Sequence, residues 1–328
     1  MSEAPRALIT GVTGQDGSYL TELLLDRGYE VHGLVRRSAT DNLQNLRPAL
    51  ARGVLNERLF LHFGDLREAL GLHRLIERIQ PREVYNLGAQ SDVALSFELP
   101  AVTTEINAVG TTLLLEAVRE AAPNARFYQA SSSEMFGRVR ETPQRETTPF
   151  YPRSPYAASK VHGYWMTVNM RESWGLFACN GILFNHESPR RGARFVTRKI
   201  ARGVADIAQG RAKTLTLGNL DARRDWGYAP EYVEAMWRML QCAEPDDYVI
   251  ATGEAHSVRD FVEAAFAVVG LPWQDHVRLD ERLRRPAEVD ALLGDASKAR
   301  EKLGWAPTVR FEELVRRMVE GELQSEAA

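Results

Sequence analysis

Short apolar segments alternate with helical patterns along the first 185 residues of the chain. Apolar runs that end in turn residues predict strands over residues 6–10, 30–35, 58–62, 83–87 and 126–130. Between them, hydrophobic residues recur at helical spacing over 18–27, in a segment that ends near residue 80, and over about 105–121. Strands that alternate with helices are typical of a parallel sheet with helices on both faces. The pattern therefore predicts an α/β fold built on a doubly wound parallel sheet.

Beyond residue 185 the pattern of hydrophobic positions becomes less regular. Segments rich in Arg, Gly and Pro separate short helical patterns over 196–209, 230–242, 258–269 and 311–323. These features predict a smaller, mostly helical C-terminal lobe packed on the sheet. We expect residues 1–185 to form the sheet domain and residues 186–328 to form this lobe, with some chain crossing back to the sheet.

Composition narrows the class of protein. The 328 residues carry a net charge of −3 and 44% of them are hydrophobic, which is ordinary for a globular protein and gives no basic surface for nucleic acid. No apolar run approaches the roughly 18–20 residues that cross a bilayer, and the first residues lack a secretory pattern. Cys179 and Cys242 have no metal-ligand spacing, and the histidines include no His-x-x-x-His pair. We expect a cytoplasmic enzyme that uses no metal, nucleic acid or membrane.

A glycine-rich segment, residues 11–17, lies between the first predicted strand and the first predicted helix. Turns collect glycine in any case, so such a segment alone is a weak indication. Here the strand before it, the helix after it and the alternating order all agree with a dinucleotide-binding loop. Its glycines would let the backbone approach a diphosphate, which the helix N-terminus would then face. We therefore predict a Rossmann-type fold in which the cofactor is held by Gly11, Thr13, Gly14, Gln15, Asp16 and Gly17.

The residues that follow the second strand bear on the choice of cofactor. An acidic residue there would hold the ribose hydroxyls of NAD, but this chain has Arg36 and Arg37. Two guanidinium groups suit the 2′-phosphate of NADP, whereas two solvated loop charges are the alternative interpretation. Ligands of such sheets bind at the carboxyl ends of the strands. We therefore also expect cofactor contacts from residues that end or follow the third and fourth strands, Asp65, Leu66, Leu87 and Ala89.

A Tyr-x-x-x-Lys pair follows the fifth strand. Ser154-Pro155 is typical of a helix N-terminus, so Tyr156 falls in the first turn and Lys160 one turn later on the same face. The lysine would favour the phenolate and lower the pKa of Tyr156, as a base that removes a proton from an alcohol requires. The alternatives are a core contact for the tyrosine and a solvated surface charge for the lysine.

Ser132 and Glu134 lie at the carboxyl end of the fifth strand, where such sheets bind ligands. Ser132 could hydrogen-bond a substrate hydroxyl, and Glu134 would add a second base beside Tyr156. Oxidation of an alcohol needs only one base, whereas removal of a proton from carbon after that oxidation needs another. The alternative for Glu134 is an acid at the start of a helix. We predict a catalytic group of Ser132, Glu134, Tyr156 and Lys160.

Several longer stretches of the chain resemble one family. The chain is similar to the GDP-mannose 4,6-dehydratases, which are extended short-chain dehydrogenases/reductases. The similarity runs nearly end to end, and its last four stretches, in the C-terminal lobe, separate this family from its dTDP- and UDP-sugar relatives. The matching stretches are residues 11–17, 83–87, 127–131, 149–156, 181–189, 195–199, 224–227 and 285–289.

The resemblance implies a reaction cycle in which NADP stores a hydride. Tyr156 would take the hydroxyl proton at carbon 4 of the sugar while a hydride leaves that carbon. The new ketone would acidify carbon 5, and Glu134 would remove that proton as water leaves carbon 6. Return of the hydride to carbon 6 would give GDP-4-keto-6-deoxymannose with no net use of NADP.

The resemblance also implies binding residues beyond the sheet. Asn185 and His186 would line the join between nicotinamide and sugar, and His186 and Arg191 would contact the cofactor. The two phosphates of a nucleotide sugar need cationic side chains, although a structural ion pair is the alternative for each arginine. The implied substrate-binding set is Ser132, Glu134, Asn185, Gly218, the diphosphate ligands Lys199, Arg224 and Arg285, and Glu288, which would hold hydroxyls.

Two departures from the family pattern are visible. Ser132 stands where the family commonly has threonine, and the hydroxyl is retained. Residues 38–42 lack a Ser-Phe-Asn-Thr run that reaches a neighbouring subunit in many members. The expected homo-oligomer could therefore be a dimer or a tetramer.

Three other functions stay open at this point. The same chemistry could act on another GDP-sugar, such as a GDP-manno-heptose. A nucleotide-sugar 4-epimerase or 4-reductase would keep Tyr156 and Lys160 but would not need Glu134 as a base. A non-catalytic NADP sensor could lose the tyrosine or the lysine, and this chain has both. Dehydration of GDP-mannose accounts for all four predicted catalytic residues.

Overall fold

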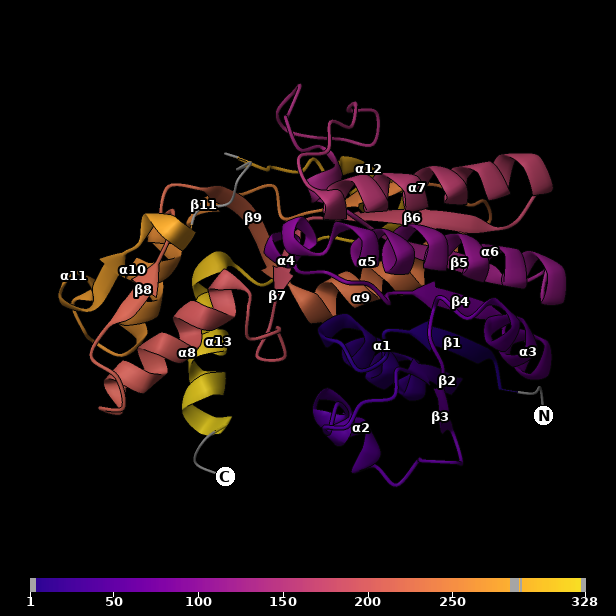
Figure 1. The fold of residues 1–328 in the computed structure, drawn as a ribbon, viewed down its shortest axis with the longest axis horizontal. Coiled ribbons are helices and arrows are strands. Elements are labelled where there is room, and N and C mark those ends of the chain that lie inside the picture. The colour runs from indigo at the N-terminus through magenta and orange to yellow at the C-terminus, as the bar shows by residue number, and fades with distance from the viewer. Residues whose placement is uncertain (1–3, 284–288, 290, 326–328) are drawn as a thin grey trace.

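A seven-stranded parallel sheet organises the molecule, as seen in the computed structural model, which describes residues 4–283, 289 and 291–325 (Figure 1). Its strand order is β10-β6-β5-β4-β1-β2-β3. The chain therefore starts in the middle and winds outward in both directions, which confirms the predicted doubly wound fold. The strands are β1 (Arg6–Thr10), β2 (Glu30–Val35), β3 (Leu59–Phe63), β4 (Glu83–Asn86), β5 (Arg126–Ser132), β6 (Ala178–Leu183) and β10 (Tyr248–Ile250).

Helices pack on both faces of this sheet. On one face, α3 (Ala69–Ile79), α6 (Gly110–Ala121) and α7 (Pro155–Trp174) contact one another, and on the other α1 (Gln15–Asp26) packs against α9 (Ala229–Met239). Alternate residues of each strand serve the two faces, as the pleat requires. Leu8, Val84 and Phe127 belong to one core cluster, and their neighbours Ile9, Tyr85 and Tyr128 to the other. The remaining helices of this part are α2 (Arg47–Leu50), α4 (Val93–Glu98), α5 (Pro100–Thr104) and α12 (Ser297–Leu303).

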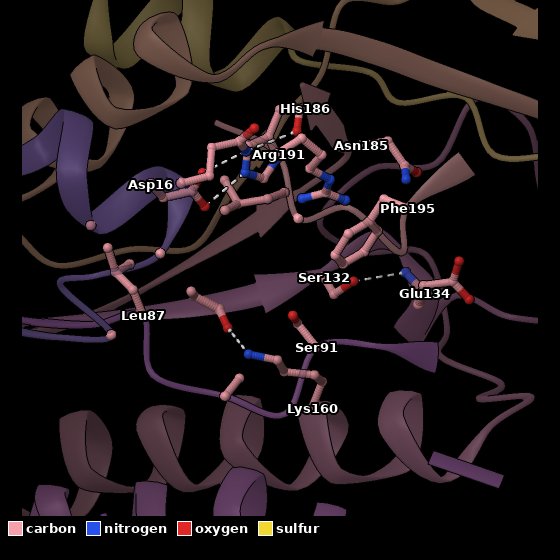
Figure 2. A pocket seen from close by; sticks show the side chains of 18 of the residues that line it. Asp16, Leu87, Ser91, Ser132, Glu134, Lys160, Asn185, His186, Arg191 and Phe195 are labelled. Atoms are coloured by element: carbon pink, nitrogen blue, oxygen red, sulfur yellow. Dashed lines mark hydrogen bonds and ion pairs between the residues drawn. The ribbon is translucent and has the colours of Figure 1, made fainter. Parts of the chain in front are cut away.

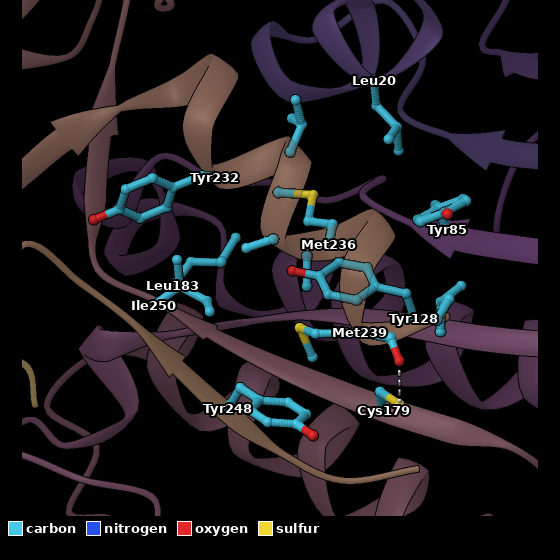
Figure 3. Close-up of a cluster of buried hydrophobic side chains, with 14 of the residues drawn as sticks. Leu20, Tyr85, Tyr128, Cys179, Leu183, Tyr232, Met236, Met239, Tyr248 and Ile250 are labelled. Atoms are coloured by element: carbon cyan, nitrogen blue, oxygen red, sulfur yellow. Dashed lines mark hydrogen bonds between the residues drawn. The ribbon is translucent and has the colours of Figure 1, made fainter. Parts of the chain in front are cut away.

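Helix α9 packs on the seven-stranded sheet, although it lies in the C-terminal half of the chain, beyond residue 185. Its Met236 and Met239 are fully buried in the same core cluster as Leu20 of α1 and Tyr128 of β5 (Figure 3). Strand β10 then pairs in parallel with β6, Tyr248 opposite Gly181. The chain therefore crosses back from the C-terminal half to complete both the core and the edge of the sheet.

The rest of the C-terminal half forms a second body, on the left in Figure 1, beside the seven-stranded sheet. Helices α8 (Val196–Ala208), α10 (Val258–Val268) and α13 (Phe311–Ser325) enclose a core of their own, and α11 (Trp273–His276) lies beside α10. This half also holds short strands that the hydrophobic pattern does not predict, because most have only three residues. They are β7 (Asn185–Glu187), β8 (Leu215–Leu217), β9 (Arg223–Tyr228), β11 (Ala255–Ser257) and β12 (Val277–Leu279).

Several predicted boundaries need correction, and strand β6, next to the edge of the sheet, was not predicted. Helix α1 begins at Gln15 and not at residue 18, because its polar first turn faces a cavity and carries no apolar periodicity. The helix that ends at Ala121 is continuous from Pro100 through a wider turn over Glu105–Val109. Strand β6 is wholly buried, but Asn180 and Gly181 interrupt its apolar run. Among the described residues, no helix is long and apolar enough to cross a membrane.

Candidate active site

Two adjoining cavities open at the carboxyl ends of the central strands. The first has a volume of about 410 Å³ and the second, toward the C-terminal lobe, about 270 Å³. Residues of both halves of the chain line the first cavity, among them the whole glycine-rich segment except Val12. Five residues line both cavities and so mark the passage between them: Val93, Glu134, Asn185, Arg191 and Phe195. Figure 2 shows the last four of them.

The glycine-rich segment forms a tight cradle between β1 and α1. Gly11 has a φ of 69°, and a Cβ atom there would lie 2.7 Å from the backbone nitrogen of Gly88, which follows β4. A Cβ atom on Gly17 would lie 2.3 Å from the Gly11 carbonyl oxygen. Only glycine fits both positions, so the backbone and the N-terminus of α1 are exposed to the cavity. Such a surface fits a dinucleotide diphosphate, which binds backbone N–H groups at a helix N-terminus.

The structure brings the four predicted catalytic residues together. Ser132 ends β5, and Glu134 lies in the single 3₁₀ turn Ser133–Met135 that follows it. The Glu134 backbone nitrogen donates a hydrogen bond to Ser132 Oγ at 3.2 Å (Figure 2). Tyr156 and Lys160 occupy the first turns of α7, where Ser154 Oγ accepts a hydrogen bond from the Ala157 nitrogen at 3.0 Å, as the predicted helix N-cap requires. All four residues line the larger cavity.

The expectation that Lys160 lowers the pKa of Tyr156 is wrong for this arrangement. Burial raises the pKa of Tyr156 to about 12; the Ser132 hydrogen bond opposes this rise and the Glu134 charge adds to it. Lys160 Nζ lies 5.8 Å from the centroid of the tyrosine ring and donates a hydrogen bond to the Ala130 carbonyl oxygen at 2.8 Å. Burial lowers the pKa of Lys160 itself to about 8. Burial is therefore the largest cause of the pKa shift of both groups.

Asn185 and His186 point in different directions from β7. Asn185 lines both cavities. His186 lines only the first cavity, and its Nε2 lies 2.8 Å from Asp16 Oδ2 of α1 (Figure 2). Successive strand residues face opposite sides, so the histidine points back toward the glycine-rich segment, and its expected place at the join stays a prediction.

Arg191 lies at the passage between the cavities. Its Nε is 3.1 Å from Glu187 Oε2, and its guanidinium carbon lies 3.7 Å from the centroid of the Phe195 ring. The ion pair and the ring contact hold the Arg191 guanidinium group where it borders both cavities. Phe195 was not predicted from the sequence.

The second cavity collects three of the predicted substrate-binding residues, Lys199, Gly218 and Arg224. Arg224 is buried and donates hydrogen bonds to the carbonyl oxygens of Val289 and Arg223 at 2.8 and 2.9 Å. Lys199 is exposed at the start of α8. Apolar side chains, including Leu217, Trp226 and Val258, also border this cavity. Arg285 and Glu288 lie outside the described residues.

The residues predicted to read the adenosine end of the cofactor do not line either cavity. Arg36 and Arg37 are exposed after β2. Side-chain hydrogen bonds from Arg67, assisted by the charge of Arg36, lower the pKa of Asp65 to about 2. Leu66 is buried, with its Cδ1 atom against Gly88. By contrast, Leu87 and Ala89 line the first cavity as expected.

Sequence reasoning missed several residues of the first cavity. Ser91 lies beyond the end of β4, two residues after Ala89, and the rule that ligands bind at strand ends could have included it. Asn45 donates a hydrogen bond from Nδ2 to the Thr13 carbonyl oxygen at 3.1 Å from a distant loop, and no local pattern could have identified it. Within the described ranges, no group of three or more His, Cys, Asp or Glu side chains is arranged to hold a metal ion.

Comparison with known proteins places this geometry among nucleotide-sugar enzymes. A family model described as GDP-mannose 4,6 dehydratase matches residues 8–318. GDP-mannose 4,6 dehydratase 1 of Arabidopsis thaliana is 57% identical over 324 residues, which cover 97% of this chain and 90% of that protein. The structure of DesIV, a dTDP-glucose 4,6-dehydratase from Streptomyces venezuelae with NAD and TYD bound, superposes with a TM-score of 0.87 at 25% identity and covers 98% of each chain. RMD from Pseudomonas aeruginosa complexed with NADPH superposes with a TM-score of 0.81 at 25% identity, over 98% of this chain and 100% of that one.

Proposed function

The chain belongs to the GDP-mannose 4,6-dehydratase family, and from that premise we propose that it converts GDP-mannose to GDP-4-keto-6-deoxymannose with NADP as its cofactor. The observation that carries this proposal is Glu134, a buried carboxyl group in the same cavity as Ser132 and Tyr156. An epimerase or a reductase needs one base at carbon 4. An enzyme that eliminates water across carbons 5 and 6 needs a second, and Glu134 supplies it.

The first step is oxidation at carbon 4. When bound, NADP would store one hydride, taken from carbon 4 and returned to carbon 6. Its oxidised ring would also carry a positive charge. Tyr156 takes the hydroxyl proton as the hydride leaves. Ser132 stabilises the phenolate through the hydrogen bond that lowers the pKa of Tyr156 against its burial. Lys160, 5.8 Å from the ring centroid, keeps a positive charge beside it.

The second step is elimination. A ketone at carbon 4 makes the proton on carbon 5 acidic enough for a carboxylate to remove, so Glu134 acts only after oxidation. The proton from carbon 5 and the hydroxyl group of carbon 6 together account for the water that is lost. When the hydride reaches carbon 6, carbon 5 requires one proton, which balances the proton that Tyr156 took from oxygen. Substrate and product therefore differ by one water, and the cofactor is unchanged.

Different residues of the two cavities would bind the cofactor and the nucleotide sugar. We assign the cofactor diphosphate to the segment Gly11–Gly17, the nicotinamide side to Leu87 and Ala89, and the 2′-phosphate to Arg36 and Arg37. The complex of RMD with NADPH supports NADP, although DesIV was solved with NAD. Asn185 and Arg191 serve the sugar and the reacting end of the cofactor. Lys199, Gly218 and Arg224 border the cavity assigned to the nucleotide sugar, with Arg285 and Glu288 assigned there by family resemblance.

We further propose two lobes, residues 1–185 for the cofactor and 186–328 for the nucleotide sugar, with α9 and β10 crossing back to the sheet, and a homo-oligomer. The outer face of α7 supports the oligomer, because it exposes 56% of Trp165 beside Val161 and Met166 around a surface hollow. An apolar face of that kind is covered by a partner more often than left in water. The unpaired thiols of Cys179 and Cys242 support a reducing compartment such as the cytoplasm.

Isotope transfer tests the proposed reaction. GDP-mannose that carries deuterium at carbon 4 should give a product with the label at carbon 6 and no exchange with solvent. The same experiment with other GDP-sugars, including a GDP-manno-heptose, should give slower turnover. Label that remains at carbon 4 would exclude the dehydratase, and label that is lost to solvent would exclude hydride storage within one active site.

A further inference from the structure

Asp16 places a carboxyl group in the first turn of α1, the helix end assigned above to the cofactor diphosphate. An acidic group is out of place there, because it would repel the phosphates that the helix N-terminus attracts. We propose that His186 is a positioning residue that neutralises Asp16 with an imidazolium group and so lets the glycine-rich segment accept an anionic cofactor. This inference rests on the proposed use of NADP.

The hydrogen bonds of His186 fix its charge. Its Nδ1 lies 2.7 Å from the Phe184 carbonyl oxygen, and its Nε2 lies 2.8 Å from Asp16 Oδ2. A carbonyl oxygen and an ionised carboxylate can only accept, so both ring nitrogens must donate, which requires the imidazolium form. The ring also stacks on Tyr232 of α9, with centroids 4.6 Å apart and planes at 20°. With both nitrogens engaged, the imidazole has no donor left for the cofactor.

The charges around the pair support this protonation state. Burial opposes ionisation of both groups, but their mutual charge and hydrogen bond raise the pKa of His186 and lower the pKa of Asp16. Arg191 acts on both groups from a greater distance, while its own guanidinium contacts Glu187. The other titratable groups that face the pair are Glu187 of β7, Tyr128 of β5, Tyr156 and Lys160 of α7, and Tyr232 of α9.

Independent hydrogen bonds hold the backbone around His186. Gln15 Nε2 donates to the His186 carbonyl oxygen at 3.1 Å, and Ser188 Oγ donates to Gln15 Oε1 at 2.8 Å. Strand β7 also pairs with β9, His186 opposite Gly227. Substitution of the imidazole should therefore leave β7 attached to α1, so that the loss of charge can be measured without loss of the fold.

Rescue by a second substitution tests the proposal. The dissociation constant of NADP would be measured by calorimetry, without sugar, for wild type, His186→Gln, Asp16→Asn and the double variant. His186→Gln should weaken NADP binding about tenfold or more, because it leaves the Asp16 carboxylate without its cation. Asp16→Asn in the same chain should restore most of that loss. A double variant as weak as His186→Gln would overturn the proposal, because it would mean that the imidazole acts by direct contact or by support of the fold alone.

Three controls separate the possible causes. His73→Gln, a histidine of α3 that lines neither cavity, should leave the NADP affinity unchanged. Added salt should reduce the loss in His186→Gln, since a charge effect is screened and a packing effect is not. As pH rises, wild type should lose affinity when His186 deprotonates, whereas the double variant should show only the change due to Lys160. Equal pH profiles for the two proteins would also overturn the proposal.

These results are distinguishable from failure of the proposed function. Wild type that binds no NADP, or that does not dehydrate GDP-mannose, would contradict the function itself. Wild type that does both, combined with an absence of rescue, would contradict only the charge-neutralising role of His186.

Discussion

The Ser132 hydroxyl accepts a hydrogen bond from the Glu134 backbone nitrogen at 3.2 Å and lowers the pKa of Tyr156 against the effect of burial. One small side chain at the end of β5 thus acts on the first proposed base and supports the turn that carries the second. Substitutions at these positions should therefore affect separate steps of the reaction in different ways.

Glu134→Gln should allow oxidation but block elimination. The amide is nearly isosteric with the carboxyl group but cannot take a proton from carbon 5, and we expect turnover to fall by about 10²–10⁴-fold. In single turnover with bound NADP, absorbance of the reduced cofactor should rise and persist. Glu98→Gln, an exposed glutamate at the end of α4, is the matched control. Normal product formation in Glu134→Gln would show that another group removes the proton.

Ser132→Ala and Ser132→Thr should differ sharply. Alanine removes the hydrogen bond that lowers the pKa of Tyr156, so the rate should fall by about one to two orders of magnitude and its rise with pH should move to higher pH. Threonine keeps the hydroxyl group and should retain most of the activity. The pH profile of kcat for the two variants checks this, and equal profiles would mean that Ser132 does not act on Tyr156.

Lys160→Met should abolish activity yet stabilise the fold at neutral pH. Burial lowers the pKa of Lys160 from 10.5 to about 8, so the folded protein binds this proton less tightly than the unfolded chain does. Below pH 8 the buried charge destabilises the folded protein by about 3 kcal/mol. Lys160→Met removes this cost but also removes the hydrogen bond to Ala130, so we expect the free energy of unfolding to rise by about 1–2 kcal/mol. The wild-type protein gains stability as pH rises from about 8 toward 10.5, so the difference should vanish there. Urea unfolding at pH 7 and pH 10 measures it, and a variant that is less stable at both pH values would contradict the result.

Arg36→Ala combined with Arg37→Ala should change the choice of cofactor. Both arginines are exposed at the end of β2. Loss of two cations suited to the 2′-phosphate should weaken NADP binding about tenfold or more and leave NAD binding nearly unchanged. Calorimetry with both dinucleotides, with Arg119→Ala on the far helix α6 as the control, gives the comparison. An equal loss for the two dinucleotides would mean that the arginines do not contact the phosphate.

Trp165→Asp should dissociate the proposed oligomer. Trp165 and Trp174 are both exposed on α7, but nine residues on a helix place them on opposite faces. A charge at Trp165 should shift the mass measured by light scattering to that of a monomer. Trp174→Asp should leave it unchanged. A wild-type chain that is itself monomeric at all concentrations would contradict the oligomer.

The parts of the site that the sequence predicts well are those set by short-range rules. Ser154 caps α7 as its sequence indicates, so Tyr156 and Lys160 fall where the helix period puts them. Gly11 and Gly17 are needed because backbone atoms crowd both positions. The strand-end rule likewise places Ser132 and Glu134 correctly.

The parts that escape prediction depend on segments far apart in the chain. The direction of the His186 side chain depends on the pairing of β7 with β9 and on the contact with Asp16, which lies 170 residues away in the sequence. The pKa of Tyr156 depends on burial by the whole surrounding structure, which the Tyr-x-x-x-Lys spacing does not report. Asn45 reaches the site from a loop with no motif of its own.

Met236 and Met239 of α9 have a consequence for how the protein is made. A ribosome that has completed residue 185 has synthesised the glycine-rich segment and all four proposed catalytic residues, but not the helix that covers one face of their sheet. Until α9 and β10 emerge, Tyr128 and the edge of β6 lack the neighbours that bury them. The nascent chain therefore completes its catalytic half only after much of the other half has been translated. A stop codon between residue 185 and α9 would leave an exposed apolar surface and not a smaller enzyme.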